Sequence, residues 1–212
     1  MYLFFKRAFD VFIALLTILI LMPVFLIVSI VIKSESPGPI IYRGKRSAKN
    51  KGFFYIYKFR TMVVDAEKKG GYSTAIDDPR FTRIGRFFRK YKIDELPQFI
   101  NIIIGDMSLV GPRPQVAFYT DQYIGEEKKI LSVRPGITDL ASIYFSDMDD
   151  VLGSGDVDEK YYKEIEPLKN KLRLKYVQEM CFSLDLKILI VTFLKIIGMK
   201  HSGFLDKEMY NL

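Results

Sequence analysis

The chain has very few of the side chains that most often carry nucleophilic or redox catalysis: one cysteine, one histidine and no tryptophan among 212 residues. Cys181, being alone, excludes an internal disulfide and is typical of a reducing, cytoplasmic compartment. His201 argues against a Ser-His or Cys-His catalytic pair and against a histidine-based metal site. No P-loop, Rossmann glycine pattern or kinase motif occurs either. Carboxylates, hydroxyls and basic groups must therefore carry whatever chemistry exists.

The longest uncharged stretch covers the 22 residues from Val11 to Ile32 and has Pro23 almost at its centre. About 20 apolar residues are enough to cross a bilayer core. Proline removes a backbone donor, so we expect a helix here to kink at Met22-Pro23. Two arms of roughly 15 Å each could enter the bilayer and return to the same face. A single-pass span is the alternative, whereas a cleaved signal peptide fits poorly because the stretch exceeds the usual apolar length.

The net charge of +7 is unevenly distributed along the chain. A basic, acid-free segment directly follows the uncharged stretch, and such segments bind anionic headgroups and mark the cytoplasmic side of a membrane. Because Lys6 and Arg7 precede the stretch, both flanks are basic, which favours a re-entrant helix as much as a spanning one. Nucleic-acid binding lacks any accompanying motif, so we expect no nucleic-acid partner. The basic residues between Ser36 and Met62 are Arg43, Lys45, Arg46, Lys49, Lys51, Lys58 and Arg60.

The pattern predicts a mostly helical α/β protein with a membrane segment at residues 1–35 and one compact cytosolic domain at residues 36–212. The apolar helix at Leu184–Met199 has two interpretations, core packing or a position on the bilayer surface. The other predicted elements are a strand at Phe53–Met62, a loop at Asp65–Pro79, a basic amphipathic helix at Arg80–Lys92, a helix at Leu96–Ile104 ended by Gly105, a short strand and rigid turn at Met107–Pro114, a similar turn at Val133–Thr138, and an exposed acidic segment at Asp147–Glu166.

The sharpest local feature is the acidic pair Asp94 and Glu95, which lies between the basic helix and the next apolar helix. A purely structural interpretation makes Asp94 an N-cap, with Pro97 tolerated in the first turn. A functional interpretation uses the same place, since a helix N-terminus favours carboxylates and bound phosphate. One carboxylate could attack phosphorus or bind Mg²⁺ while the other handles a proton. Arg113, in Gly-Pro-Arg-Pro, either contacts phosphate or belongs to a plain turn.

Six segments then make the chain recognisable. Together they closely resemble the small monotopic phosphoglycosyl transferases of the bacterial sugar transferase family, over nearly the whole chain. Each segment alone is a weak signal, but the ordered set is highly specific. The segments are the N-terminal stretch centred on Pro23, Tyr57-Lys-Phe-Arg-Thr-Met62, Ile84-Gly-Arg-Phe-Phe-Arg89, Ile93-Asp-Glu-Leu-Pro-Gln98, Gly105-Asp-Met-Ser-Leu-Val-Gly-Pro-Arg-Pro114 and Arg134-Pro-Gly-Ile-Thr138.

The resemblance implies transfer of a sugar-1-phosphate from a UDP-sugar to a polyprenyl phosphate, usually undecaprenyl phosphate, with release of UMP. It also implies a re-entrant helix broken at the proline, amphipathic helices at the interface, and a catalytic domain on the cytoplasmic face of the bacterial inner membrane. By this resemblance Asp94 is the nucleophile that forms a phosphosugar-aspartyl intermediate, with Mg²⁺ beside it. Glu95 assists the second half by taking the proton from polyprenyl phosphate. The candidate phosphate or substrate contacts are Lys58, Arg60, Arg89, Arg113 and Arg134.

Two segments depart from the family pattern. Many members continue Pro-Gly-Ile-Thr with Gly-Trp-Ala-Gln and an Asn-Gly-Arg turn, whereas this chain continues from Thr138 with Asp-Leu-Ala-Ser-Ile-Tyr-Phe145. This difference concerns nucleotide and sugar recognition rather than phosphoryl chemistry. Met22 precedes Pro23, where a hydroxyl residue is common, so the helix break is expected to be held differently here.

Two other functions remain open from the sequence. The first is a non-catalytic module that binds anionic lipid through its basic segments, Arg43–Arg60 and Arg80–Lys92. The second is a membrane-bound phosphatase that uses the same aspartate and transfers phosphoryl groups to water. The expected partners are a UDP-sugar, a polyprenyl phosphate and membrane lipids, and a homo-oligomer is compatible with the apolar helices. The sequence does not select the sugar, nor does it distinguish capsule, O-antigen and glycoprotein pathways.

Overall fold

The computed structural model describes residues 1–66, 78–145, 163 and 165–199. Most of the loop predicted at Asp65–Pro79, most of the acidic segment Asp147–Glu166, and His201 lie outside these residues. The described part is mostly helical with two small sheets, as predicted. Its helices are α1 (Tyr2–Glu35), α2 (Arg83–Lys90), α3 (Gln98–Ile104), α4 (Ala117–Thr120), α5 (Leu140–Tyr144), α8 (Glu166–Glu179) and α9 (Phe182–Ile196), its strands are β1 (Ile41–Ser47), β2 (Phe53–Phe59), β3 (Ser108–Val110) and β4 (Gly136–Thr138), and its 3₁₀ turns are η1 (Lys49–Lys51), η3 (Ile93–Glu95) and η4 (Gly125–Ser132).

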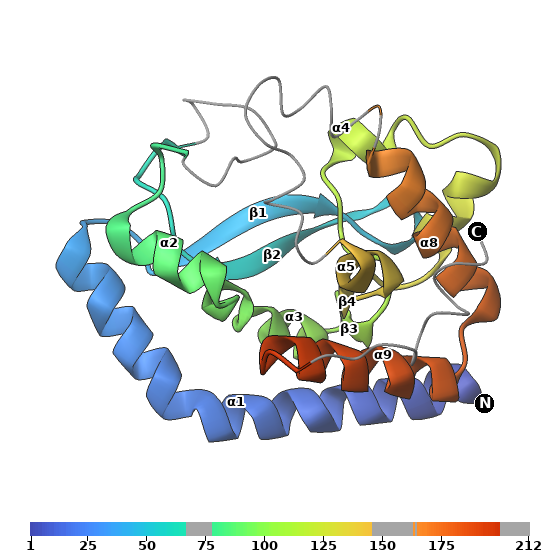
Figure 1. The fold of residues 1–212 in the computed structure, drawn as a ribbon, viewed down its shortest axis with the longest axis horizontal. Helices are drawn as coiled ribbons and strands as arrows, with labels where there is room; N and C mark the ends of the chain where they lie inside the picture. The colour runs from blue at the N-terminus through green and yellow to red at the C-terminus, as the bar shows by residue number, and fades with distance from the viewer. Residues whose placement is uncertain (67–77, 146–162, 164, 200–212) are drawn as a thin grey trace.

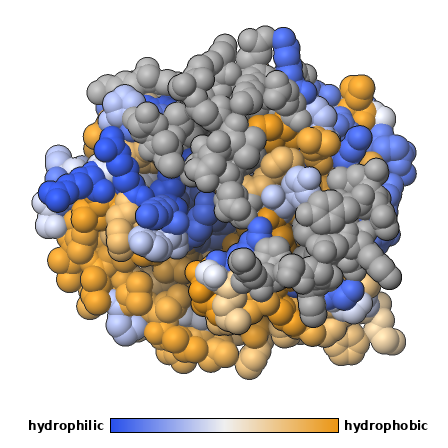
Figure 2. All heavy atoms as spheres, viewed as in Figure 1, coloured by the Kyte–Doolittle hydropathy of each residue, from blue (hydrophilic) through white to orange (hydrophobic). Residues whose placement is uncertain are grey.

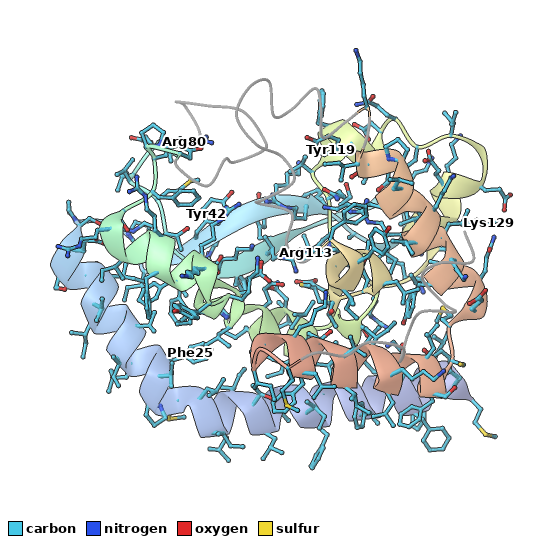
Figure 3. All side chains as sticks on the ribbon, viewed as in Figure 1. Phe25, Tyr42, Arg80, Arg113, Tyr119 and Lys129 are labelled. Atoms are coloured by element: carbon cyan, nitrogen blue, oxygen red, sulfur yellow. The ribbon has the colours of Figure 1, made fainter. Side chains whose placement is uncertain are left out.

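The N-terminal helix α1 is long and apolar enough to cross a membrane by length and composition. It bends partway along its length (Figure 1), in the portion that contains Pro23, as the missing backbone donor predicts. Phe25, two residues after the proline, projects from the arm that follows the bend (Figure 3). Apart from a few buried positions, α1 leaves large apolar side chains exposed. These contribute to the hydrophobic surface along the lower edge of the molecule in Figure 2.

Both arms of α1 pack against the rest of the chain. Ala14, on the first arm, is fully buried in the main hydrophobic core. Val28 and Ile32, on the second arm, form a smaller cluster with Phe59 of β2 and Phe88 of α2. Burial of such a side chain contributes roughly 1.5–3 kcal/mol, so each arm has its own attachment to the same body.

Strands β1 and β2 form an antiparallel hairpin with Ser47 opposite Phe53 and Ile41 opposite Phe59. The predicted strand at Phe53–Met62 therefore ends at Phe59. Alternate residues of a strand face the same side; Phe54 and Ile56 face the main core, and Lys58 continues that face towards the candidate site.

Asn101 attaches α3 to the edge of this hairpin. Its Oδ1 accepts a hydrogen bond from the amide of Tyr57 at 2.8 Å, and its Nδ2 donates to the carbonyl of Tyr55 at 2.8 Å. A side-chain amide thus replaces the backbone partner that a third strand would supply. The result is a fixed distance between β2, which carries Lys58, and the helical segment that carries the acidic pair.

A second, parallel pair of strands joins β3 to β4, with Ser108 opposite Gly136 and Val110 opposite Thr138. The turn predicted at Val133–Thr138 therefore includes a strand. Directly after β3, the backbone at Gly111 lies against Gly136 of β4, so closely that a Cβ on Gly136 would lie 2.1 Å from the amide nitrogen of Gly111. Glycine is required at such a contact. This contact holds the start of the Gly-Pro-Arg-Pro turn against β4.

The last helix, α9, has two apolar faces. Leu184, Ile188 and Val191 are buried in the main core, which confirms the core interpretation of this segment. Its opposite face leaves Phe182, Leu186, Ile190, Phe193 and Ile197 exposed at helical spacing. In Figure 1, α9 lies beside the first arm of α1, so exposed apolar side chains of both helices lie near one edge of the molecule.

Candidate functional site

Asp94 and Glu95 lie in the 3₁₀ turn η3, between α2 and α3. Lys92, which follows the end of α2 and precedes η3, adopts a left-handed conformation (φ 56°), and the amide of Glu95 donates to its carbonyl. The structural interpretation of Asp94 as an N-cap is wrong, because Asp94 lies inside the turn and makes no capping hydrogen bond. Its carboxylate is therefore not committed to helix geometry.

Glu95 is held by two cations from different elements. Its Oε1 accepts a hydrogen bond from Lys58 Nζ of β2 at 2.9 Å and forms an ion pair with Arg113 Nη2, from the turn after β3. Burial by itself would raise the pKa of Glu95, but the charges of Arg113 and Lys58 outweigh it and hold the pKa well below its usual range. Glu95 is consequently ionised at neutral pH.

Asp94 has a different environment although it is the adjacent residue. It is 6% exposed, and its Oδ1 has no hydrogen-bond partner among the described residues. Lys58 Nζ lies 3.9 Å from Oδ2, closer to an ion-pair contact than to a hydrogen bond. Burial raises the pKa of Asp94, opposed by the charges of Lys58, Arg89 and Lys92. The pair therefore combines one tightly bound carboxylate with one that keeps an unused oxygen.

Hydrogen bonds hold both the backbone amide and the guanidinium of Arg113. Its Nη1 donates to the carbonyl of Ile137 in β4 at 2.8 Å, and its amide donates to Asp139 Oδ2 at 3.0 Å. Burial lowers the pKa of Arg113, but Glu95 and Asp139 more than compensate, so the guanidinium remains charged. Of the predicted phosphate contacts, Lys58 and Arg113 thus meet at the acidic pair.

The other predicted contacts lie in three different places. Arg89 stacks over the Phe81 ring at 4.9 Å and still adds its charge to the surroundings of Asp94. Arg60 donates from Nη2 to the carbonyl of Ser36 at 2.8 Å and from Nη1 to the carbonyl of the next residue, so it braces the exit from α1. Arg134 donates to the carbonyl of Gly105 at 3.0 Å, at the far end of α3 from the acidic pair. Phosphate binding by these three arginines remains a prediction.

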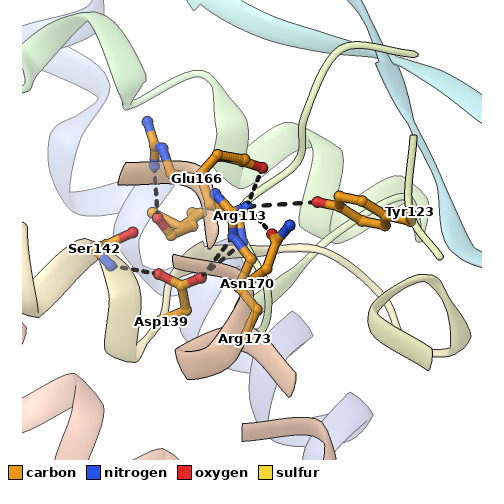
Figure 4. Close-up of polar contacts among 8 residues, drawn as sticks. Arg113, Tyr123, Asp139, Ser142, Glu166, Asn170 and Arg173 are labelled. Carbon is orange, nitrogen blue, oxygen red and sulfur yellow. Dashed lines mark hydrogen bonds and ion pairs between the residues drawn. The ribbon is translucent and has the colours of Figure 1, made fainter. Parts of the chain in front are cut away.

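Sequence reasoning missed a buried charged network behind Arg113 (Figure 4). Its centre is Arg173 of α8, whose Nη1 donates to Glu166 Oε1 at 2.7 Å and to Asn170 Oδ1 at 2.8 Å. Arg173 Nε also lies 4.0 Å from Asp139 Oδ2. One signal was available, because Asp139 is the first residue at which the chain departs from the Gly-Trp-Ala-Gln pattern.

Within the described residues, no group of three or more His, Cys, Asp or Glu side chains is placed to hold a metal ion. A magnesium site that relies on one or two carboxylates and on substrate phosphates needs no such group. The unused Oδ1 of Asp94 is the hard oxygen ligand that such a site requires. The donor chemistry therefore fits Mg²⁺ at Asp94.

The amino-acid sequence was also compared with known proteins. The family model described as bacterial sugar transferase matches residues 1–199. The chain is 35% identical over 208 residues to the UDP-glucose:undecaprenyl-phosphate glucose-1-phosphate transferase of Escherichia coli K12, covering 97% of this chain and 41% of that protein. It is 41% identical over 155 residues to the UDP-N-acetylgalactosamine-undecaprenyl-phosphate N-acetylgalactosaminephosphotransferase of Aeromonas hydrophila, covering 70% of this chain and 37% of that protein. The chain thus spans about two-fifths of the length of these two relatives.

A third relative is closer in length. The putative undecaprenyl-phosphate N-acetylgalactosaminyl 1-phosphate transferase of Bacillus subtilis is 45% identical over 125 residues, which cover 59% of this chain and 70% of that protein. The names of all three relatives include undecaprenyl phosphate; two of them name N-acetylgalactosamine and one names glucose.

Proposed function

Because the chain belongs to the bacterial sugar transferase family, we propose that it transfers a sugar-1-phosphate from a UDP-sugar to undecaprenyl phosphate and releases UMP. The observation that carries this proposal is the contrast between the two adjacent carboxylates. Glu95 is ionised and bound by Lys58 and Arg113, while Asp94 keeps an unused oxygen beside the same cations. Such a pair can divide the roles of nucleophile and proton acceptor.

In the first half-reaction, a carboxylate oxygen of Asp94 attacks the phosphorus that bears the sugar. A bond from Asp94 to phosphorus forms as the bond to the uridylyl phosphate breaks, and UMP leaves with that electron pair. Lys58 and Arg113 lie where they can offset the charge on the transferred group. In the second half, an oxygen of undecaprenyl phosphate attacks the same phosphorus and releases Asp94.

The proton of the lipid phosphate goes to Glu95. While Lys58 and Arg113 hold this carboxylate, its depressed pKa makes it a weak base. Phosphate groups that compete for the two cations would weaken their hold and raise the pKa of Glu95 towards its ordinary value. Substrate binding and base activation are thus linked through the same ion pairs. Mg²⁺ at Asp94 would supply further charge neutralisation when bound.

We also propose that α1 is re-entrant, with the catalytic domain on the cytoplasmic face of the bacterial inner membrane. The support is that both arms attach to one body: Arg7, near the start of α1, donates to the carbonyls of Ile102 and Ile103 of α3, and Ile32, near its end, packs with Phe59 and Phe88. A helix that crossed the bilayer would place its two ends on opposite sides. The exposed apolar faces of α1 and α9 would lie in the membrane.

Cysteine labelling tests the topology. In a Cys181→Ser background, insertion of one cysteine between Met1 and Tyr2 and the substitution Ser34→Cys each place a single thiol at one end of α1. We expect a membrane-impermeant maleimide to label neither variant in intact spheroplasts or protoplasts. Both variants should be labelled once these cells are lysed. Labelling of one position from outside would instead identify a spanning helix.

The enzymatic test measures UMP release by the purified protein with Mg²⁺, undecaprenyl phosphate and a panel containing UDP-glucose and UDP-N-acetylgalactosamine. We expect repeated turnover to require both the lipid and a particular sugar nucleotide, with at most one UMP released per enzyme molecule when the lipid is left out. Multiple turnovers without lipid, with free sugar phosphate as product, would identify a phosphatase. Binding to anionic vesicles without any UMP release would identify a lipid-binding module.

A further inference from the structure

We propose that Arg173 of α8 is a positioning residue that aligns Arg113 in the site, acting through Asp139 and Gln115. This inference rests on the proposed function, since it assigns Arg113 to the reacting phosphates. Arg173 itself does not touch the acidic pair in the described structure. Its effect would pass through the Gly-Pro-Arg-Pro turn.

The environment of Arg173 is unusual for a helix arginine. The residue is 2% exposed and sits between two carboxylates, Glu166 on its own helix and Asp139 before α5. Arg173 Nη1 also lies 3.5 Å from the hydroxyl oxygen of Tyr123, which shortly precedes η4 in the chain (Figure 4). Because burying several charges is costly unless they are paired, each contact constrains the orientation of the guanidinium.

Two routes lead from this guanidinium to the turn that carries Arg113. The first passes through Asp139, which is fully buried and whose Oδ2 accepts the Arg113 amide at 3.0 Å. Its other oxygen accepts the amide of Ser142 at 2.6 Å and so caps α5. In the second, the side-chain oxygen of Gln115, when turned towards α8, accepts from Arg173 Nη1 at 3.3 Å and from Nη2. Arg173 thus contacts the turn directly at Gln115 and lies 4.0 Å from the carboxylate that accepts the Arg113 amide.

We infer that the buried charged network fixes the position of the turn and does not only stabilise the fold. Buried apolar residues of similar volume often stabilise a fold as well as a buried ion pair does. A charged network instead restricts geometry, and catalytic groups need placement to within about 0.5 Å. A displacement of about 1 Å can cost about 100-fold in rate. Asp139, the first residue that departs from the family pattern, lies between α8 and the turn that carries Arg113.

Hydrogen exchange of the intact protein, followed by mass spectrometry, tests the positioning directly. Arg173→Met removes the charge and keeps much of the volume, and Lys171→Met removes a charge from the exposed face of the same helix. We expect Arg173→Met to speed exchange in peptides covering residues 111–116 at least several-fold, with β2 peptides unchanged. Lys171→Met should leave both regions unchanged. Unaltered exchange at residues 111–116 in Arg173→Met would overturn the proposal, whether or not the protein proves to be a transferase.

A double-mutant cycle tests whether the effect reaches activity through Arg113. We expect Arg173→Met to lower kcat/KM for UMP release by about 10- to 100-fold in the wild-type background, and by less than about threefold in an Arg113→Gln background. An equal loss in both backgrounds would assign Arg173 a general structural role and refute the proposal. Asp139→Asn, which preserves shape, serves as the second variant if Arg173→Met does not fold, with the same pattern expected.

The two proposals fail in different ways. Absence of UMP release by the wild-type protein with every sugar nucleotide counts against the proposed transferase. Normal wild-type release together with additive effects in the cycle counts only against the role of Arg173.

Discussion

Asp94→Asn is expected to reduce UMP release by on the order of 10⁴-fold or more, the largest effect of any substitution considered for this protein. An amide nitrogen and its carbonyl oxygen cannot replace a carboxylate as the nucleophile towards phosphorus. The same substitution replaces the anionic oxygen ligand proposed for Mg²⁺ with a neutral and weaker amide oxygen. Because both losses act on the first half-reaction, no burst of UMP should remain without lipid, and no labelled sugar phosphate should be trapped on the protein.

The stability of this variant separates chemistry from folding. Burial raises the pKa of Asp94 in the folded state. At pH values above the ordinary pKa of aspartate, the ionised carboxylate therefore destabilises the folded protein relative to the unfolded chain. A neutral amide of the same shape removes that penalty, and thermal unfolding at neutral pH should occur at the same or a higher temperature than in the wild type. Near-normal UMP release by folded Asp94→Asn would contradict the assignment of the nucleophile.

Glu95→Gln is expected to lower steady-state turnover by roughly 10²- to 10⁴-fold, the range for loss of a general base. Its signature differs from that of Asp94→Asn, because Asp94 remains available to attack the sugar nucleotide. A single burst of UMP without lipid should persist, while transfer to undecaprenyl phosphate becomes slow. Rapid-quench measurement of the burst and of the steady state separates the two phases. Loss of both phases to the same extent would show that Glu95 does not act specifically in the second half.

The same variant has a distinct pH dependence of stability. The folded-state pKa of Glu95 is depressed, so its ionised form stabilises the fold above the unfolded pKa of about 4.3. That contribution is lost as the pH falls towards the folded-state value. The wild type should therefore unfold at a higher temperature than Glu95→Gln at pH 7, and the difference should shrink below about pH 4. Glu126→Gln, at an exposed glutamate on η4, is the matched control and should change neither turnover nor this profile.

Local patterns predicted much of the site correctly. Alternation along Phe53–Met62 predicted a strand with Lys58 and Arg60 on one face, because side chains of a strand alternate regardless of its partners. The structure places Lys58 beside the acidic pair, whereas Arg60 follows the end of β2 and bonds to the exit from α1. A rigid turn was predicted at Gly-Pro-Arg-Pro, with Arg113 either a phosphate contact or part of a plain turn, and the structure directs its guanidinium to Glu95. The uncharged stretch around Pro23 predicted a bent apolar helix. Each of these features depends on a few neighbouring residues.

Long-range contacts decided the features that were missed. The sequence allowed Asp94 to be an N-cap, but in the structure the left-handed Lys92 precedes a 3₁₀ turn that contains Asp94. Arg60 and Arg134 belonged to basic motifs, yet each guanidinium bonds to a backbone carbonyl supplied by a distant segment. The partners of such flexible side chains depend on which segments approach them, which sequence spacing does not reveal.

The sequence alone therefore determined the family of this protein, through an apolar helix with a central proline, an adjacent carboxylate pair and basic residues that occur in the order typical of that family. Only the tertiary structure decided which cations meet the pair and what holds them, as with Arg173, which lies 34 residues after Asp139 in the chain but only 4.0 Å from its carboxylate. The physical reason is that backbone periodicity follows from adjacent residues, whereas ion pairing in a buried site depends on distance through space and on exclusion from water.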